Sequence, residues 1–325
     1  MSDAVNVMMI GFPASGKTSY MASLYHRFSS ETVAGFNIQC TCSHNHENLV
    51  RLGKNIQSGV YPDSTDFLSK YSFYLRYEGK TVLPFNWHDY RGGALISSYE
   101  VAKEVLDEIN QADALIVFLD ATSFVGSESR KAVTTVKRVY KLIQFAVQNK
   151  PQDIRFPISI AITKADAVDL SQLVESEPMK MIASQIIPTV SQSKSICGLF
   201  TFTVVGPTCA YIEYPFIFSM WLCLQNKFIE YTKIANQCAE EYQGCLRDAN
   251  EHWKKSGLID SFMSFMVDEP SHRELAIRKQ ESAFNNLKHA NDILDELKKI
   301  EGPLDILEKI VSAGNEDEDS LVALF

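Results

Sequence analysis

Residues 11–18, which read Gly-Phe-Pro-Ala-Ser-Gly-Lys-Thr, constrain the fold of this chain more than any other stretch. They follow an apolar run at 5–10, which predicts a buried strand, and they precede a helical spacing of apolar residues over 17–28. A strand, a glycine-containing loop and a helix in this order turn backbone N–H groups toward one point at the helix N-terminus. The pattern therefore predicts a loop that binds the phosphates of a nucleotide.

Each position of this loop has a physical role. Gly11 and Gly16 allow backbone angles and close approaches that a Cβ atom would block. Lys17 is expected to reach the β- and γ-phosphates, and Thr18 to offer its hydroxyl to Mg²⁺. The loop residues expected to contact the nucleotide are Gly11, Ala14, Ser15, Gly16, Lys17, Thr18 and Ser19.

Apolar runs later in the chain alternate with helical patterns. The further expected strands are 114–119, 157–162 and 199–205, and an alternating pair at 71–77 and 81–87 predicts a hairpin. Residues 29–66 are expected to be irregular, apart from a short strand at 36–40 and a short helix at 47–57. Continuous apolar runs suit strands that are buried on both faces. We therefore expect an α/β fold of the phosphate-loop nucleotide-binding type, with a mostly parallel sheet and helices on both faces.

The pattern changes after about residue 215, where no further strand is expected. Helices are expected instead at 215–250, 252–266 and 271–300, with a short one from Pro303. Within 271–300 an amphipathic helix is expected, which could bind a protein partner. Its apolar side chains recur at a spacing of three and four residues: Leu287, Ala290, Leu294 and Leu297. The expected parts are a nucleotide-binding domain at 1–230, an all-helical extension at 231–314 and a solvated acidic tail at 315–325.

Composition restricts the partners and the compartment. The formal net charge is −9 and the pI about 5.3, so binding to the phosphate backbone of nucleic acid is not expected. The stretch 214–224 is apolar but shorter than the roughly 20 residues that cross a bilayer, so a buried helix that begins at Pro215 is expected here and no membrane span. Seven scattered cysteines and an N-terminus unlike a signal peptide predict a reduced, cytoplasmic protein.

A second motif closes the strand at 81–87. It reads Asp89-Tyr-Arg-Gly92, in which Asp89 is expected to hold Mg²⁺ through water and the Gly92 N–H to sense the γ-phosphate. Thr65, in the loop before the strand at 71–77, is the candidate for completing the Mg²⁺ shell. Ser64 and Thr41 are the alternatives to it. The residues expected to take part in phosphate chemistry are Lys17, Thr65 and Gly92.

A third motif follows the apolar run at 157–162 and reads Thr163-Lys164-Ala165-Asp166. The Asp166 carboxylate is placed to accept hydrogen bonds from the N1–H and the 2-amino group of guanine, neither of which adenine has. The stem of Lys164 is expected to lie over the plane of the base, and Thr163, Lys164 and Asp166 are the residues of this motif expected to contact the nucleotide. The pattern favours GTP over ATP, although an aspartate in a plain surface turn after a strand is the alternative interpretation.

With these three motifs in this order, the chain resembles GTPases of the translation-factor-related (TRAFAC) class, which are built on a Ras-like G domain. In particular it resembles bacterial members of that clade from multi-gene conflict systems. The resemblance covers about residues 5–230. It implies a six-stranded, mostly parallel sheet, binding of Mg²⁺ with GTP or GDP, and a nucleotide-dependent molecular switch.

Several positions depart from the Ras-like pattern. Gly93 stands where Ras-like proteins have the glutamine that orients the attacking water, so hydrolysis is expected to be slow or stimulated by a partner. His88 and Arg91 flank the motif and are candidates to substitute for it. Pro13 would crowd an arginine finger that arrives from another protein. The base-contacting loop that follows the last strand in such GTPases is not recognisable, and Val205-Gly206-Pro207 occupies its place.

Two other functions remain open from the sequence. Asp120 ends the apolar run at 114–119 and could be the Mg²⁺ ligand of an ATPase. A scaffold that binds nucleotide with negligible turnover is also compatible with Gly93. Cys40, Cys42, His44 and His46 are zinc-ligand types, but their spacing is poor for one ion and an incidental loop is the preferred interpretation.

Overall fold

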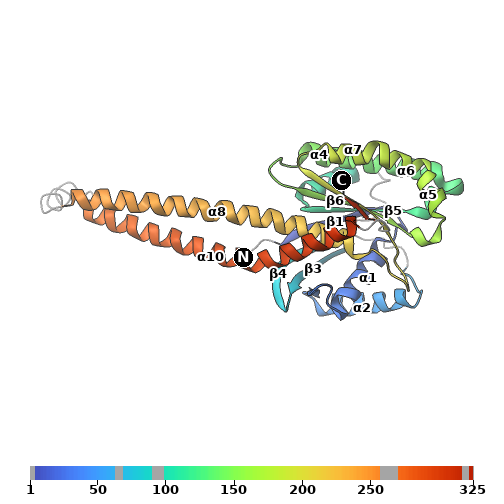
Figure 1. Cartoon of the computed structure of the whole chain (residues 1–325), viewed down its shortest axis with the longest axis horizontal. Coiled ribbons are helices and arrows are strands. Elements are labelled where there is room, and N and C mark those ends of the chain that lie inside the picture. Colours follow the sequence, from blue (N-terminus) through green and yellow to red (C-terminus); the bar gives the residue numbers. More distant parts are fainter. Residues whose placement is uncertain (1–3, 63–68, 90–98, 257–269, 317–321, 325) are drawn as a thin grey trace. The chain divides into compact units, whose positions relative to one another are not determined.

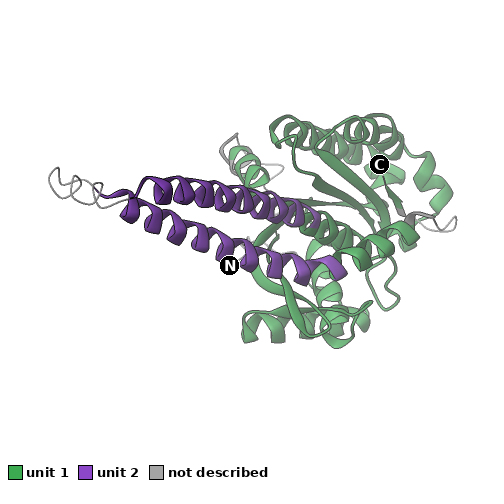
Figure 2. Ribbon diagram, turned by 60° about the vertical axis from the view of Figure 1, so that its left-hand side comes forward, with its two compact units in different colours: residues 1–224, 303–325 green, residues 225–302 purple. Residues whose placement is uncertain are grey.

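The computed structural model describes residues 4–62, 69–89, 99–256, 270–316 and 322–324. The chain forms two compact units, which are described separately (Figure 2). Unit 1 comprises Met1–Leu224 and Pro303–Phe325, and unit 2 comprises Gln225–Gly302.

Unit 1 is built on an eight-stranded sheet with the order β2-β3-β4-β1-β5-β6-β7-β8 (Figure 1). Neighbouring strands from β4 to β7 are parallel, whereas β2, β3 and β8 pair antiparallel at the two sides. The strands are β1 Val5–Gly11, β2 Phe36–Cys40, β3 Ser69–Tyr77, β4 Lys80–Asp89, β5 Ala114–Asp120, β6 Phe156–Thr163, β7 Ile196–Thr203 and β8 Val322–Leu324.

Helices cover both faces of this sheet, with α1 and α2 on one face and α4 to α7 on the other (Figure 1). The helices of the first 200 residues are α1 Lys17–Ser30, α2 Ser43–Gln57, α3 Tyr99–Gln111, α4 Ser129–Asn149, α5 Leu170–Glu175, α6 Glu177–Met181 and α7 Ile187–Ser191. A short π-helix, Ile182–Ile186, joins α6 to α7. Two long helices follow, α8 Glu213–Lys255 and α10 His272–Glu316.

Alternate residues of the central strands enter two separate cores. Met8 and Ile10 of β1 face a core that is shared with α3, α4, α6 and α7. On the other face, aromatic rings from α1, β4, β5 and α8 pack edge to face or stacked, and Trp87 lies 5.6 Å from Phe216 between ring centroids. This second core lies directly beneath α1, so it fixes the position of the loop that precedes that helix.

The mostly parallel sheet and the 71–87 hairpin are confirmed, but the sheet has eight strands and not six. β2 and α2 add an antiparallel edge strand and a helix between α1 and β3, in a region where a strand and a short helix were expected within irregular chain. No strand was expected after residue 215, yet Val322–Leu324 in the acidic tail pairs with β7. An edge strand leaves backbone groups unpaired, and β8 satisfies those of β7.

The two long helices also differ from the expected segments. α8 is continuous to Lys255, where a break near residue 250 was expected, and most of the predicted helix 252–266 lies outside the described residues. α10 continues through Pro303, where a separate short helix was expected. The boundary between the two units nevertheless falls at Pro303.

Unit 2 is a helical hairpin formed by the parts of α8 and α10 within Gln225–Gly302 (Figure 2). The two helices are joined by the ion pair between Lys279 and Asp248 at 2.8 Å. The buried positions of α10 recur at heptad spacing and are small near the start: Ala276, Ala283, Ala290, Ile293 and Ile300. Of the apolar side chains expected on one face of this helix, Ala290 is buried, whereas Leu287 and Leu294 are exposed.

No described helix is both long enough and apolar enough to cross a membrane. This holds for α8 despite its apolar first turns, in which Phe216, Phe218 and Leu222 are buried within unit 1. The expectation of a buried helix over 214–224 is confirmed.

We expect Gly53→Ala to destabilise unit 1. A Cβ at this position of α2 would lie 2.4 Å from the Cβ of His26 and 2.9 Å from the Ala22 carbonyl oxygen, so α1 and α2 would have to separate. Overpacking of this kind costs about 1–3 kcal/mol, which a lowered urea midpoint of unfolding would reveal.

The matched control is Gly244→Ala in α8, where an added Cβ meets nothing within 4 Å. Alanine is a better helix former than glycine, so this variant should be as stable as the wild type or more stable by up to about 1 kcal/mol. Equal midpoints for Gly53→Ala and the wild type would contradict the close packing of α1 on α2.

Candidate functional site

The carboxyl ends of neighbouring parallel strands bring the candidate residues to one edge of the sheet. Gly11 ends β1, Asp89 ends β4, Asp120 ends β5 and Thr163 ends β6. β1 lies between β4 and β5, and the register pairs Met9 with Asp89 and Asp120 with Thr163. Ligands of open α/β sheets bind at this edge, so the arrangement defines the candidate site.

The loop after β1 has the backbone that the sequence predicts. Gly16 has a φ of 85° and precedes the first residue of α1, which points N–H groups out of the helix N-terminus. A Cβ on Gly11 would lie 2.5 Å from Ser15 Oγ and 2.8 Å from the Phe118 carbonyl oxygen. Glycine is therefore required at position 11 for packing and at position 16 for backbone conformation.

Ala14 lies within this loop, and Ser19 follows it in α1. Ala14 is exposed and has a φ of 61°, which is uncommon for a residue other than glycine and marks a strained backbone. Ser19 lies in the first turn of α1 and is half-buried. Ser15 is buried, and its hydroxyl has no hydrogen-bond partner among the described residues.

Lys17 is the first residue of α1 and folds back over the loop. Its Nζ donates to the carbonyl oxygens of Gly11 at 2.9 Å and Phe12 at 3.3 Å. Burial lowers the pKa of Lys17, and the nearby Asp89 carboxylate opposes that shift. A cation held at the mouth of a nest of N–H groups provides positive charge for a phosphate.

Thr18 and Asp89 meet across 71 residues of sequence. Thr18 Oγ1 donates to Asp89 Oδ2 at 2.9 Å. Asp89 is only 3% exposed, and its other oxygen, Oδ1, has no hydrogen-bond partner among the described residues. Burial raises the pKa of Asp89, whereas Lys17 and the Thr18 hydroxyl act in the opposite direction.

These two side chains fit a divalent cation. Mg²⁺ prefers hard oxygen ligands and retains several waters, and a buried carboxylate with one unpaired oxygen beside a hydroxyl supplies that chemistry. A buried carboxylate oxygen without a hydrogen-bond partner is costly, which gives Asp89 a physical reason to bind a cation.

Thr163 is hydrogen-bonded to the backbone of the loop. Its hydroxyl donates to the Ser15 carbonyl oxygen at 2.8 Å and approaches the Leu119 carbonyl oxygen at 3.2 Å. Thr163 is 1% exposed, so its side chain acts within the protein and supports the loop. The sequence placed Thr163 among the nucleotide contacts, and the structure gives it this supporting contact to the loop.

Lys164 and Asp166 follow on the same edge. Lys164 adopts the left-handed region, with φ 55°, and its Nζ lies 2.5 Å from Asp120 Oδ2. The other oxygen of Asp120 accepts from the backbone N–H and the hydroxyl of Thr122. Asp166, two residues after Lys164, is exposed. Both oxygens of Asp120 are thus bonded to Lys164 and Thr122, whereas Asp89 is the candidate carboxylate that contacts Thr18.

Tyr61 is a candidate that sequence reasoning did not single out. Its hydroxyl donates to the Val205 carbonyl oxygen at 3.2 Å, in the loop after β7 where a base contact was sought. A Cβ on Gly206 would lie 2.8 Å from that hydroxyl, so glycine allows the approach. The two loops are 144 residues apart, and the only sequence signal was an aromatic side chain in one and a Val-Gly-Pro stretch in the other.

Other candidates lie elsewhere. Thr65, Ser64, Arg91, Gly92 and Gly93 fall outside the described residues. Thr41 is tied to the outer strands, because its hydroxyl donates to the Ser72 carbonyl oxygen at 3.0 Å. Among the described residues no group of three or more His, Cys, Asp or Glu side chains could hold a metal ion. The stretch expected to be a loop is the end of β2 at Cys40 and the start of α2, which contains His44 and His46.

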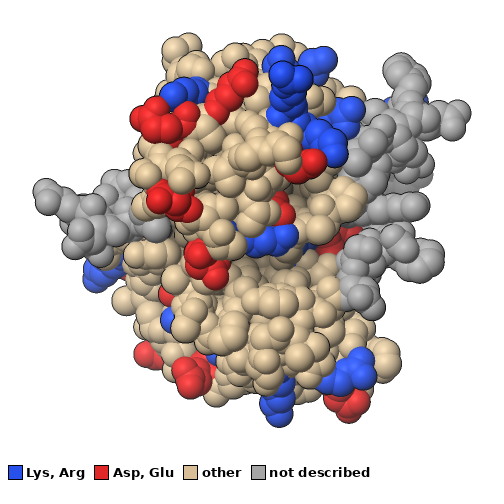
Figure 3. Space-filling view, turned by 90° about the vertical axis from the view of Figure 1, so that its right-hand side faces the viewer, with Lys and Arg blue, Asp and Glu red and all other residues tan. Residues whose placement is uncertain are grey.

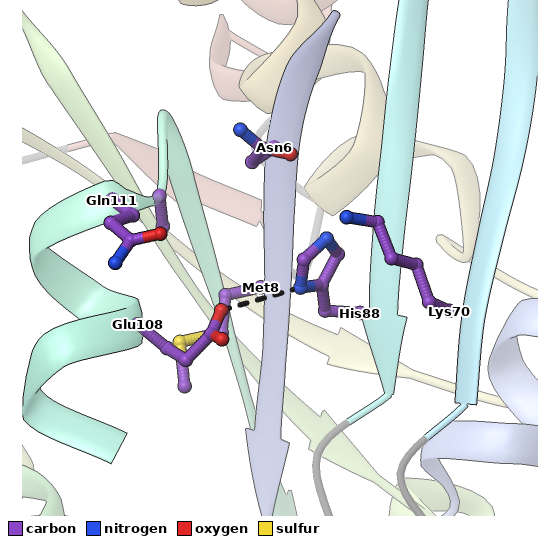
Figure 4. Close-up of a pocket in the computed structure, with 7 residues that line it drawn as sticks. Asn6, Met8, Lys70, His88, Glu108 and Gln111 are labelled. Carbon is purple, nitrogen blue, oxygen red and sulfur yellow. Dashed lines mark ion pairs between the residues drawn. The ribbon is translucent and has the colours of Figure 1, made fainter. Parts of the chain in front are cut away.

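His88 points away from the loop, since successive residues of a strand face opposite sides of the sheet. Its Nδ1 lies 3.4 Å from Glu108 Oε2 of α3, in a cavity of about 150 Å³ that Asn6, Met8 and Lys70 also line (Figure 4). Burial lowers the pKa of His88, with Lys70 adding to the shift and Glu108 opposing it. This geometry does not support the suggested substitution of His88 for the missing glutamine.

The topology and the site define a phosphate-loop nucleotide-binding domain of the Ras-like, TRAFAC-type G-domain class. The chain belongs to the Double-GTPase 1 family, whose family model matches residues 8–186, more than half of the sequence. GTP binding is thus the property expected of the fold and of the family. No curated protein matches the sequence.

Solved structures of GTPases are among those that match this chain. One is the signal recognition particle receptor SRb in a GTP/SRX complex from Chaetomium thermophilum, with 12% identity, 63% of this chain and 92% of that chain covered, and a TM-score of 0.39. Another is the Arl6 BBS3 small GTPase from Trypanosoma brucei, with 12% identity, 69% and 99% covered, and a TM-score of 0.39.

We expect Thr163→Val to weaken nucleotide binding. The change keeps the shape of the side chain but removes the hydroxyl that holds the Ser15 carbonyl, which leaves a buried acceptor unpaired at a cost of about 1–3 kcal/mol. If that cost falls on the loop, the affinity for GTP should drop roughly 10-fold, since 1.4 kcal/mol is a factor of ten.

Thr203→Val is the control, because Thr203 is paired with Thr163 in the neighbouring strand and is also buried, but does not contact the loop. Fluorescent-nucleotide titration of both variants measures the difference. Equal affinities in the two variants would show that Thr163 does not support the loop.

Proposed function

We propose that the chain is a Mg²⁺-dependent GTP-binding protein that acts as a nucleotide-dependent switch and hydrolyses GTP slowly or when a partner stimulates it. Lys17 and the backbone N–H groups of 11–18 would hold the phosphates. Thr18 and Asp89 would hold Mg²⁺, with Thr65 and the Gly92 N–H completing the site from outside the described residues. When bound, Mg²⁺ would neutralise charge on the phosphates.

The hydrogen bond between Thr18 and Asp89 carries this proposal. It joins the loop hydroxyl and a buried carboxylate on the strand directly beside β1, which is where a G domain needs its metal-binding residues. The ATPase alternative requires Asp120 instead. Asp120 is held by Lys164 and Thr122, which supports a role in positioning the base-reading segment.

Guanine would be read by the segment after β6. Asp166 is exposed, and no hydrogen bond or ion pair of its carboxylate occurs among the described residues, so it is accessible to the base. Asp120 restrains Lys164 through their ion pair. The proposal therefore assigns recognition of the base to Lys164 and Asp166, and support of the loop to Thr163.

Slow turnover is proposed from the sequence, because Gly93 offers no side chain to orient water. The same glycine favours a second function, a nucleotide-bound scaffold with negligible hydrolysis. In either case the chain must bind nucleotide before a partner can respond to it. That the chain acts in a bacterial conflict system stays a prediction.

Partners and location are also proposed. The C-terminal helices would bind a protein partner in one nucleotide state. Acidic as well as basic side chains occupy the face shown in Figure 3, and the net charge is −9, which argues against nucleic acid as the partner. None of the seven cysteines, all of which lie within the described residues, is in a disulfide, which supports a reducing, cytoplasmic location.

We expect wild-type protein to prefer GTP over ATP, and Asp166→Ala to lose most of that preference. A hydrogen bond to a charged group contributes about 1.5–3 kcal/mol, so the affinity for GTP should fall roughly 10- to 100-fold while ATP binding stays the same. Competition between labelled GTP and each unlabelled nucleotide measures both affinities.

Asp169→Ala is the matched control, since Asp169 lies three residues away and its carboxylate caps α5 through Ser171 and Gln172. It should keep the preference for GTP. If the wild type bound both nucleotides equally and Asp166→Ala had no effect, residues 163–166 would be a plain turn with no role in recognising the base.

We expect Asp89→Asn to weaken the dependence of GTP binding on Mg²⁺. The amide retains the shape but not the charge, and residues that orient metal-bound groups typically change metal affinity about 10- to 100-fold. Asp120→Asn should leave the Mg²⁺ midpoint unchanged. A Mg²⁺ titration of GTP binding compares the two, and a shift confined to Asp120→Asn would favour the ATPase interpretation.

A further inference from the structure

The helical hairpin of unit 2 has a second apolar line that its own packing does not use. Four large apolar side chains of α10 are exposed: Ile277 by 41%, Phe284 by 66%, Leu287 by 39% and Leu294 by 44%. We call these four residues the exposed stripe. Single exposed apolar residues are ordinary, but four in one line on one helix indicate an interaction surface.

The exposed stripe runs beside the seam that holds the hairpin together. The buried seam repeats every seven residues through Ala276, Ala283 and Ala290. Ile277 and Phe284 each follow a seam alanine by one residue, and Leu287 and Leu294 each follow one by four residues. These offsets place all four on one side of the helix, next to the seam and facing outward.

The spacing within the stripe points to the partner. The intervals are seven, three and seven residues, which read the same in both directions. If a second α10 ran antiparallel to the first, Ile277 would face Leu294 of that copy, and Phe284 would face Leu287. Each copy would then cover all four apolar side chains of the other, as a two-fold symmetric interface requires.

From this pattern we propose that the exposed stripe binds the exposed stripe of a second copy of this chain, with the two α10 helices antiparallel. The occupant is thus a homodimer partner, and the contact is confined to unit 2. The proposal does not depend on nucleotide binding, because none of the four residues belongs to the site at 11–18.

Charges beside the stripe agree with the antiparallel register. Glu281 and Lys288 are exposed on the flank next to Ile277 and Phe284. In the antiparallel pairing like flanks meet, so Glu281 of each copy would face Lys288 of the other. The next pair on this flank, Glu274 and Asp295, carries two negative charges. Each of these carboxylates has a partner in its own chain, because Glu274 accepts from the Ser271 N–H at 3.0 Å and Asp295 accepts from Lys298 at 3.1 Å.

The size of the stripe sets the expected strength. It is about 26 Å long at 1.5 Å per residue and one helix wide. Such an area lies at or below the ~1,200 Å² lower limit of stable complexes, so the dimer should dissociate in the micromolar range. Phe284, the most exposed member, is the expected anchor.

The test is sedimentation velocity of the full chain at increasing concentration, up to roughly 200 µM. The wild type should shift from 36.6 kDa toward twice that mass. Phe284→Ser should raise the dissociation constant at least about 30-fold, as expected for loss of an anchor residue. Ile229→Ser, which removes an exposed apolar residue of α8 outside the stripe, should leave the dimer intact.

Charge reversal tests the orientation. Glu281→Lys and Lys288→Glu should each weaken the dimer, and the double variant should restore it, because the reversed pair is again complementary across the antiparallel interface. The weakening is expected to be small, about 2- to 5-fold, because both charges are exposed. Circular dichroism should show the same helix content in all variants.

Three results would overturn the proposal. The wild type could stay monomeric over the whole concentration range. Phe284→Ser could dimerise as strongly as the wild type, which would place the interface elsewhere. The double charge variant could fail to recover, which would exclude this register. GTP affinity, measured on the same samples, should be unchanged by Phe284→Ser and therefore reports separately on the proposed function.

Discussion

The position of β1 at the centre of a parallel sheet is the constraint on which the rest of the site depends. Because β4 and β5 flank β1 in parallel, their carboxyl ends meet the loop after β1 at one edge. That geometry brings Asp89 to Thr18 from 71 residues away and leaves Asp120 beside Lys164, in the segment proposed to read the base. A single topological choice thereby separates the carboxylate proposed to bind Mg²⁺ from the other candidate.

Burial sharpens the chemistry of this edge. Lys17 and Asp89 are both nearly inaccessible to solvent. Burial lowers the pKa of Lys17 and raises the pKa of Asp89, which favours the neutral form of each, whereas the attraction between the two charges opposes both shifts. A pair held in this way is costly to the protein alone. A phosphate and a divalent cation would compensate both charges, which gives the fold a physical reason to bind them together.

The features that depend on residues close together in the sequence were predictable. The loop at 11–18, Asp89 at a strand end and the mostly parallel sheet follow from glycine positions and apolar runs. Contacts between distant segments were not. Nothing local pairs Tyr61 with Val205, adds the three-residue β8 to β7, or divides the apolar residues of α10 between a buried seam and an exposed stripe. These features depend on which surfaces meet in the folded chain.

The most direct test of the account is a crystal structure of the chain with Mg²⁺ and a non-hydrolysable GTP analogue. The account predicts that Mg²⁺ binds Thr18 Oγ1 at about 2.1 Å, with Asp89 bonded to one of its waters and the guanine facing Asp166. A metal ion bound instead by Asp120, or a nucleotide bound away from residues 11–18, would contradict it.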